Sequence, residues 1–339
     1  MYKIFRPALW MLFKSFMAPM ALMALMALMA VSTANAQNAS NYPNKPIKMI
    51  VPFPPGGGND VIARIVAQKL TTRWGQNVVV ENRAGANGIV GLTTVVQAAP
   101  DGYTLGIAAH GPMAVNPHLY DKMPFNPLKD FEPITNMVNY PLLLVAHPSV
   151  PAKTIPELLA LVRSQPGKIN YASPGNGNSG HLAGELFNSL AKVNTTHVPY
   201  KGQGPATADL LAGQVQLLYS SIPSVLNFVQ QGRLNAIAIG SAKRLSSLPN
   251  IPTLSESGVP GYEAYSWIGI VAPLGTPKDI VQKLNREIVS ILRQKDVEED
   301  LLRQGAITVG DTPEHFAQYI KDEMDKWGAV VKSANIKAD

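Results

Sequence analysis

Short apolar runs rich in Val, Ile and Leu alternate along the chain with longer segments in which apolar residues recur every three or four positions. The short runs predict β-strands, and the longer segments predict amphipathic α-helices. The predicted strands are Ile47–Val51, Val78–Val80, Leu105–Ala108, Leu142–Ala146, Ile169–Ala172, Thr196–Val198, Leu217–Tyr219 and Trp267–Pro273. The predicted helices are Val61–Leu70, Ile89–Ala98, Pro156–Arg163, Ser179–Ala191, a short helix ending near Ala212, and a helix after Thr276. The alternation is typical of βαβ units, so the sequence predicts an α/β fold with two layered units on largely parallel sheets.

Three segments carry the same helix-start signal. Each offers a threonine hydroxyl, a proline in the first turn and an early acid, at Thr154–Glu157, Thr276–Asp279 and Thr312–Glu314. We expect each threonine to cap its helix by accepting a hydrogen bond from the first turn.

The pattern of the first 36 residues differs from that of the rest. Lys3, Arg6 and Lys14 precede an apolar run over Phe16–Val31, which is followed by the small residues Ala34–Ala36. This order predicts a secretory signal peptide (1–36), cleaved after about Ala36, and therefore export. A retained membrane anchor is the alternative, because the run is near the lower length limit for a spanning helix. The small-residue motif favours cleavage.

Composition excludes several classes of site. The chain has no cysteine, which excludes disulfides and thiolate metal sites. Without the three cations of the signal peptide, the formal charge of +6 falls to +3, from 26 Lys and Arg against 23 Asp and Glu. This balance gives no basic footprint for nucleic acid. The six histidines lack zinc-site spacing, so we predict no metal. No G-K-[ST] follows the glycines at 56–58 and no nucleophile elbow is complete, so we predict no cofactor and no catalytic residue.

The first candidate binding segment is Pro52–Asp60, which carries three consecutive glycines between a predicted strand and helix. Glycine allows close backbone approach, and a helix start presents free N–H groups, so an anion is expected there. A tight turn capped by Asn59 or Asp60 is the alternative. Because a carboxylate repels an anion, we expect the Asp60 side chain to turn back and cap the helix.

The second candidate segment, Tyr171–His181, repeats the order of strand, glycine-rich loop and helix. Its Gly175, Gly177 and Gly180 match G-x-G-x-x-G, which alone indicates a dinucleotide fold. That fold requires an acid after the next strand, whereas Thr196–Lys201 contains none. An anion cradle of backbone N–H groups remains, supplemented by Ser173, Asn176 and Ser179. For His181, ligand contact and simple packing are both open.

The third candidate segment is Tyr200–Ala206, which leads into a short helix. Pro205 fits the first turn, so helix initiation alone explains the segment. In the alternative, Lys201 adds positive charge near the anion.

The chain resembles the periplasmic receptors of tripartite tricarboxylate transporters, also called Bug proteins. The motifs that carry the resemblance span almost all of the chain after the signal peptide. They are Pro52–Asp60, Glu81–Gly88, Ala99–Leu105, Ser173–Glu185, Val198–Ala206, Pro252–Tyr262 and Gly269–Asp279. Two positions depart from the usual family pattern, Asn59 in the first loop and Pro174 in the second. Both keep the backbone donors, so they affect side-chain specificity.

The resemblance implies a type II periplasmic-binding-protein fold of two α/β domains with a ligand cleft between them. One domain is formed by 43–142 plus 266–336 and the other by 143–265. It implies a monomeric periplasmic receptor, not an enzyme, that closes around a small carboxylate and passes it to membrane transporter subunits. Phe53, His110, Gly111, Ser220 and Ser221 are expected to add specificity. The expected ligand-binding residues are Phe53, Gly56, Gly57, Gly58, Asn59, Asp60, His110, Gly111, Ser173, Gly175, Asn176, Gly177, Ser179, His181, Lys201, Gly204 and Ser220.

Two other functions remain possible from the residues. One is an exported dinucleotide-dependent or hydrolytic enzyme, although Ser179 lacks the closing glycine of a hydrolase nucleophile elbow. The other is a receptor that feeds a membrane sensor kinase.

Overall fold

The computed structural model describes residues 41–337, so the predicted signal peptide and its cleavage site lie outside the described residues. The chain divides into two compact units, Met1–Asn44 and Lys45–Asp339. Every helix and strand of the described residues belongs to the second unit. Within residues 41–337, no helix has both the length and the apolar character needed to cross a bilayer.

The described strands form one continuous sheet with the order β2-β1-β3-β9-β4-β7-β5-β6, and β8 and β10 each pair with β4. Parallel pairs join β1 to β2 and β3, and β5 to β6 and β7. The strands are β1 (Ile47–Val51), β2 (Val78–Asn82), β3 (Thr104–Ala109), β4 (Phe131–Ala146), β5 (Asn170–Ser173), β6 (Thr196–Pro199), β7 (Leu217–Ser221), β8 (Asn235–Ile239), β9 (Tyr265–Pro273) and β10 (Ile307–Thr308).

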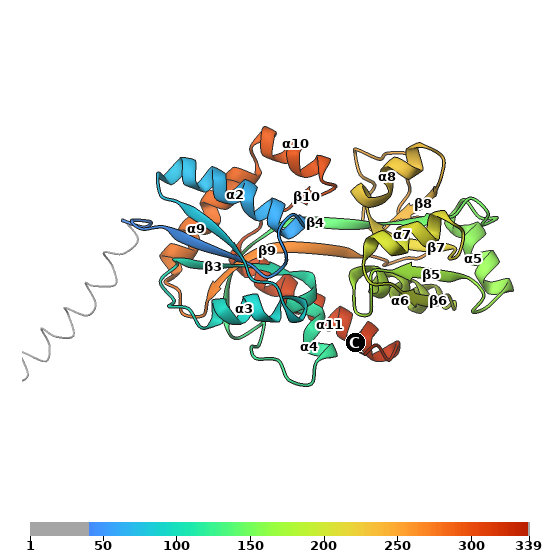
Figure 1. Cartoon of the computed structure of the whole chain (residues 1–339), viewed down its shortest axis with the longest axis horizontal. Helices are drawn as coiled ribbons and strands as arrows, with labels where there is room; N and C mark the ends of the chain where they lie inside the picture. The colour runs from blue at the N-terminus through green and yellow to red at the C-terminus, as the bar shows by residue number, and fades with distance from the viewer. Residues whose placement is uncertain (1–40, 338–339) are drawn as a thin grey trace, which may run out of the picture. The chain divides into compact units, whose positions relative to one another are not determined.

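Helices pack on both sides of this sheet (Figure 1). They are α2 (Gly58–Trp74), α3 (Ile89–Val96), α4 (Asn116–Leu119), α5 (Ile155–Ser164), α6 (Ser179–Ala191), α7 (Gln203–Leu211), α8 (Ile222–Gln230), α9 (Lys278–Leu292), α10 (Lys295–Arg303) and α11 (Pro313–Ser333). Two short helical segments, η1 (Ala86–Gly88) and η2 (Gly111–Val115), precede α3 and α4 respectively.

Strand β4 divides the sheet into two halves. Up to Pro141 it pairs with β9, and from Leu142 it pairs with β7. We call β1, β2, β3, β9 and β10 with α2, α3, α9 and α10 half 1, and β5 to β8 with α5 to α8 half 2. Figure 1 shows half 1 on the left and half 2 on the right, with β4 and β9 running between them. Half 1 is thus built from an early and a late part of the described chain.

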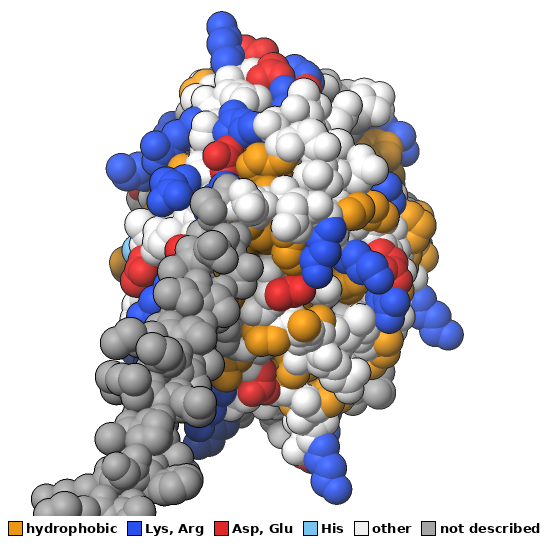
Figure 2. Space-filling model, turned by 90° about the vertical axis from the view of Figure 1, so that its left-hand side faces the viewer, with side chains coloured by type: hydrophobic (Ala, Val, Ile, Leu, Met, Phe, Trp, Pro, Cys, Tyr) orange, Lys and Arg blue, Asp and Glu red, His pale blue; other side chains and the backbone are white. Residues whose placement is uncertain are grey.

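The strands have few polar positions because helices cover both faces of the sheet. Strand β9 is buried from Trp267 to Pro273, and the core of half 2 includes Leu143, Val145 and Leu218. On the face of half 1 seen in Figure 2, positive and negative side chains are interspersed with apolar ones, and the described residues form no large area of one charge there.

All the predicted strands and helices are confirmed in position, but the prediction of largely parallel sheets is only partly right. Strands β4, β8, β9 and β10 pair antiparallel, because β4 and β9 carry the chain between the halves in opposite directions. Strand β4 also begins 11 residues before the predicted Leu142. Its early part contains the buried polar residues Thr135 and Asn136, which hide the strand pattern. The Asp311 carboxylate accepts a hydrogen bond from the Asn136 N–H at 2.7 Å.

Two of the three predicted helix caps are confirmed. The Thr154 hydroxyl accepts a hydrogen bond from the Glu157 N–H in a reciprocal capping box, and the Thr312 hydroxyl accepts one from the His315 N–H. The prediction for Thr276 is wrong. Helix α9 is capped by Pro277 without a side-chain bond, because the Thr276 hydroxyl donates instead to the Pro273 carbonyl at 2.7 Å.

Candidate functional site

A cavity of about 710 Å³ lies between half 1 and half 2. Its walls come from the starts of four helices and from the two strands that join the halves. None of the described residues that line it has a charged side chain. They are Gly56, Gly57, Gly58, Asn59, Tyr140, Leu142, Pro174, Asn178, Ser179, Gln203, Tyr219, Ser220, Ser221, Pro223, Ser224, Ser266, Ile268 and Gln304.

The first glycine-rich loop contributes backbone atoms to the cavity. Helix α2 begins at Gly58, with Gly57 as its N-cap residue and no side-chain cap. The Asp60 N–H already donates to the Gly57 carbonyl at 3.0 Å, whereas the N–H groups of Gly58 and Asn59 before it have no carbonyl acceptor within the helix. Because glycine has only backbone atoms, Gly57 and Gly58 present the peptide group itself to a ligand. The Tyr140 hydroxyl lies close to Gly58, since a Cβ placed there would be 3.5 Å from it.

The Asp60 side chain does not line the cavity, because its carboxylate forms hydrogen bonds with other residues. Its carboxylate accepts bonds from the Gly56 N–H, from Arg64 Nε and from Asn82 Nδ2, each at 2.9 Å. The bond from the Arg64 guanidinium is the main cause that lowers the pKa of the Asp60 carboxyl to about 2. The Asp60 side chain therefore turns back as expected, but the prediction that it caps the helix is wrong. Helix α2 starts earlier than predicted, with Gly57 as its N-cap residue, so Asp60 braces Gly56 from inside the first turn.

The second glycine-rich loop meets the cavity at the start of α6. Asn178 is the N-cap residue, and its side-chain oxygen accepts a hydrogen bond from the Gly180 N–H at 3.0 Å. Asn178 and Ser179 line the cavity together with Pro174. Gly177 is buried with a φ of 68°, and an added Cβ would collide with the Leu119 side chain, so this position requires glycine.

His181 holds this loop from behind. Its Nδ1 accepts a hydrogen bond from the Gly177 N–H at 3.1 Å, which requires the neutral ring with the proton on Nε2. The ring stacks on His197 with centroids 3.6 Å apart, and His197 Nε2 lies 2.6 Å from the Ser173 hydroxyl. Burial, with the neighbouring His197, lowers the pKa of His181 to about 3. His181 and Ser173 are buried and do not line the cavity.

Two further helix starts complete the walls. Helix α7 begins at Gln203, whose amide donates hydrogen bonds to the hydroxyls of Ser220 and Thr207, both at 3.0 Å. Helix α8 follows Ser221 as its N-cap residue, and the hydroxyls of Ser221 and Ser224 lie 2.7 Å apart. Hydroxyl and amide groups therefore surround this end of the cavity.

The four helix starts give the neutral cavity a positive potential. Helices α2, α6, α7 and α8 each direct their first residues to it. A helix N-terminus is equivalent to roughly half a positive charge. The arrangement therefore favours a ligand that carries negative charge.

Of the residues predicted to bind ligand, the structure brings six together at the cavity: Gly56, Gly57, Gly58, Asn59, Ser179 and Ser220. Ser221, which was expected to add specificity, also lines the cavity. The others lie behind it or away from it. His110 is buried between the rings of Trp267 and Trp327, 3.8 Å from Glu323, and burial lowers its pKa to about 4.

The remaining predicted residues do not line the cavity for varied local reasons. Phe53 and Gly111 lie next to the η1 segment, since a Cβ added to Gly88 would meet Phe53 and one added to Gly111 would meet Asn87. Gly175 lies against the Tyr200 carbonyl, and Asn176 lies beside a different, smaller hollow near Ile336. Lys201 and Gly204 are exposed outside the lining, before and within α7.

Several lining residues were not predicted as site residues: Tyr140, Leu142, Pro174, Asn178, Gln203, Tyr219, Pro223, Ser224, Ser266, Ile268 and Gln304. The sequence did contain a signal for the lining residues at the start of α8. Ser221 followed by Ile222 and Pro223 has the order of an N-cap residue and an early proline, as at Thr154. Tyr140, Ser266 and Gln304 are distant in sequence, and only the pairing of β4 with β9 and β10 brings them together.

Residues 62–336 match the tripartite tricarboxylate transporter family receptor. The chain is 39% identical to protein BugT of Bordetella pertussis over 291 residues, which is 86% of this chain and 89% of that protein.

Among solved structures, an R. palustris protein with adipate is 34% identical, with a TM-score of 0.75 over 88% of this chain and 99% of that chain. MatC from Rhodopseudomonas palustris with bound malate is also 34% identical, with a TM-score of 0.70 over 86% of this chain and 100% of that chain. These relatives confirm the expected α/β periplasmic-binding-protein fold, and the motifs quoted above together with the family match establish that the chain belongs to the tripartite tricarboxylate transporter family of receptors.

Proposed function

We propose that this protein is a periplasmic receptor that captures a small carboxylate in the cavity between its two halves and delivers it to the membrane subunits of a tripartite tricarboxylate-type transporter. The observation that carries the proposal is the convergence of four helix N-termini on one cavity without a charged side chain in its lining. Such a site binds an anion through N–H groups and dipoles.

The ligand class follows from the chemistry of the lining and from the relatives. Backbone N–H groups and hydroxyls suit carboxylate oxygens, which accept several hydrogen bonds at once. Two family members with similar folds are solved with adipate and malate, both of which are dicarboxylates. A second pair of helix starts, α7 and α8, is available for the second carboxylate or for a polar group in its place.

Capture is proposed to occur by closure of two domains, 43–142 plus 266–336 and 143–265. Strand β4 changes its pairing partner between Pro141 and Leu142, and β9 begins to pair with β4 at Tyr265. Bending at these two positions moves α2 relative to α6, α7 and α8. Because each half supplies part of the donors, ligand binding and closure become one event.

The binding residues proposed here are the six predicted ones that line the cavity, with Tyr140, Asn178, Gln203, Ser224 and Gln304 added. Asp60, Ser173, Gly177 and His181 are proposed to hold the two loops in shape. The arrangement suits binding and not hydrolysis, since the Ser179 hydroxyl donates to the Asn178 side chain and His181 is engaged by Gly177.

The proposal is tested by thermal unfolding and calorimetric titration with adipate, malate and shorter or aromatic acids. The matched controls are the diamides of adipate and malate, which keep the shape and lose the charge. At a concentration about 100 times its Kd, a true ligand raises the free energy of unfolding by about 2.7 kcal/mol. We expect at least one acid to do so and its amide to fail. Equal responses to acid and amide, or no response to any acid, would overturn the proposal.

Delivery to the transporter is tested separately. Purified protein loaded with radiolabelled ligand is added to vesicles that contain the large and small membrane subunits of a tripartite tricarboxylate-type transporter. Uptake should depend on the receptor and on the subunits. Uptake that is unchanged without the receptor would contradict this part of the proposal.

A further inference from the structure

We propose that the turn between α10 and β10 is the contact that limits closure of the two halves, with Gly305 and Pro223 as positioning residues for ligand binding. This inference rests on the proposed function and adds to it a determinant outside the two glycine-rich loops. Gly305 belongs to half 1, whereas Pro223 lies in the first turn of α8 in half 2.

The two halves touch at this point without room for a side chain. A Cβ added to Gly305 would lie 2.8 Å from Pro223 Cδ, 3.2 Å from Pro223 Cγ and 3.3 Å from Ile222 Cβ. Real Cβ atoms do not approach a ring carbon at 2.8 Å, and the proline ring has little freedom to retreat. The backbone of half 1 therefore lies directly against the start of α8.

The turn is stiff enough to act as a stop. The N–H groups of Gln304, Gly305 and Ala306 donate to carbonyls at the end of α10, at 3.0 Å from Leu301, 2.9 Å from Leu302 and 2.9 Å from Leu301 respectively. Gly305 has a φ of 73°, as is usual for a glycine that ends a helix. Leu301 and Ala306 are buried, and β10 then pairs with β4 opposite Val138 and Asn139.

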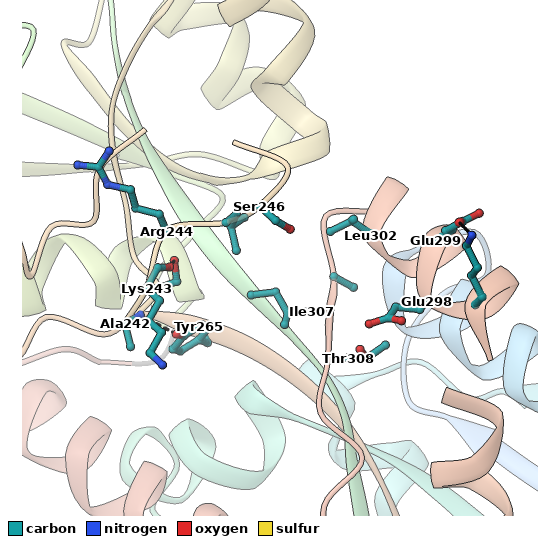
Figure 3. A pocket seen from close by; sticks show the side chains of 14 residues that line it. Ala242, Lys243, Arg244, Ser246, Tyr265, Glu298, Glu299, Leu302, Ile307 and Thr308 are labelled. Atoms are coloured by element: carbon teal, nitrogen blue, oxygen red, sulfur yellow. Dashed lines mark hydrogen bonds and ion pairs between the residues drawn. The ribbon is translucent and has the colours of Figure 1, made fainter. Parts of the chain in front are cut away.

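The turn also stands between two cavities. Gln304 lines the ligand cavity, while Leu302, Ala306, Ile307 and Thr308 line a second cavity of about 630 Å³. Figure 3 shows this second cavity between the 242–246 loop of half 2 and the end of α10 in half 1, with Ser246 and Leu302 on opposite sides of it. The second cavity leaves a gap between the halves, so further approach is limited where the turn meets α8.

The contact consequently sets the distance from Gln304 to Ser224 across the ligand cavity. A side chain at position 305 pushes α8 away, and the donors at the two sides of the cavity then no longer reach the same ligand. Because closure and binding are one event in the proposed function, the affinity must fall with the loss of closure.

The binding test uses adipate as the probe and compares Gly305→Ala with Gly310→Ala. Gly310 has a similar φ of 64° in the same half, and its added Cβ would meet only Val289 and Leu292, both in half 1. The two variants therefore share the backbone strain, but only Gly305→Ala collides with half 2. We expect Gly305→Ala to raise Kd by at least about tenfold and Gly310→Ala to change it by less than about twofold.

Removal of the Pro223 ring distinguishes a collision with half 2 from backbone strain at position 305. In a double-mutant cycle, adding Gly305→Ala to Pro223→Ala should weaken adipate binding by only about twofold, because no ring carbon remains in the path of the new methyl group. A full tenfold loss in both backgrounds would overturn the proposal, as would equal affinities of Gly305→Ala and the wild type.

Closure itself is measured by spin labels, which the absence of cysteine makes simple. Labels on Ser246→Cys and Leu302→Cys face each other across the second cavity. We expect Gly305→Ala, with and without adipate, to move the label-to-label distances to longer values, and Gly310→Ala to leave them unchanged. Unchanged distances in Gly305→Ala would contradict the stop. If the wild type binds no acid but Gly305→Ala still lengthens the label-to-label distances, the proposed function is wrong, whereas the proposal that this contact limits closure is supported.

Discussion

At the scale of one residue, the effect of a substitution at Gly57 on ligand binding can be separated from its effect on folding. Its φ of −81° and ψ of 168° are open to any L-residue, and an added Cβ meets nothing nearer than the Pro54 carbonyl at 3.9 Å. The backbone therefore does not require glycine at this position, whereas the proposed site depends on the absence of a side chain there.

Substitution Gly57→Val is expected to abolish measurable binding of adipate and to leave the melting temperature nearly unchanged. The branched side chain covers the N–H groups at the start of α2 and strains no backbone angle. Calorimetric titration measures the loss of binding, and circular dichroism measures the melting temperature. A folded variant that binds as tightly as the wild type would remove the first loop from the site.

The buried His181 makes stability depend on pH. Its pKa of about 3 lies below the ordinary value of 6.5, so between these values the unfolded chain binds a proton that the folded chain does not. The free energy of unfolding therefore falls as the pH falls through this window, by up to about 1.4 kcal/mol per pH unit for this group.

In His181→Asn the side-chain oxygen can still accept the Gly177 hydrogen bond, but the side chain at position 181 no longer titrates. We expect a variant that is less stable at pH 7, because the stacking on His197 is lost, and that shows a flatter slope between pH 6 and about 4. Urea unfolding at several pH values measures the slope. The same slope in both proteins would show that His181 does not carry this dependence.

The candidate site was only partly predictable from single residues. Three consecutive glycines before a helix indicate a backbone cradle because that pattern has a physical use in the local chain. Tyr140 and Gln304 have no such local signal, since their role depends on which strands pair. His110 shows the opposite error, because a polar residue after a strand was expected at a site and is buried among tryptophans instead.

At the scale of elements, helix starts were the most predictable feature. A cap involves residues within one turn, so its signal is contained in four consecutive positions. Thr276 shows the limit of this rule, because the same order of residues also allows the hydroxyl to bond backward to Pro273. Strand direction was less predictable, because it depends on the path of the chain between β4 and β9 and not on the apolar pattern.

The capping box of α5 should contribute measurably to stability. Replacement Thr154→Ala removes the acceptor for the Glu157 N–H and is expected to lower the free energy of unfolding by about 1 kcal/mol. Thr154→Ser keeps the hydroxyl and serves as the control, with a much smaller loss. Urea denaturation distinguishes the two. Equal losses in both variants would assign the effect to the lost methyl group and not to the cap.

At the scale of the whole molecule, the two halves share β4 and are joined also by β9, so the proposed closure requires these strands to bend. A saturating carboxylate ligand is expected to reduce the radius of gyration measured by small-angle X-ray scattering. Gly57→Val, which is expected not to bind, should show no reduction under the same conditions. A wild-type radius that is unchanged by a ligand of proven affinity would contradict closure.

Family resemblance predicts one domain built from both chain ends and one built from the middle, whereas apolar periodicity alone indicates only two layered units. Periodicity describes each element, but the return of the chain through β9 is a long-range event. The polar segment around Asn136 shows why, since its partner Asp311 lies 175 residues away.

The cradle of peptide groups has a consequence for evolution. Donors that belong to the backbone persist through most side-chain substitutions, so the proposed carboxylate binding would survive while Tyr140, Gln203, Ser224 and Gln304 vary. Duplicated copies of such a gene can therefore drift to new acids without passing through a form that binds nothing. A family of receptors with one architecture and many ligands is the expected result.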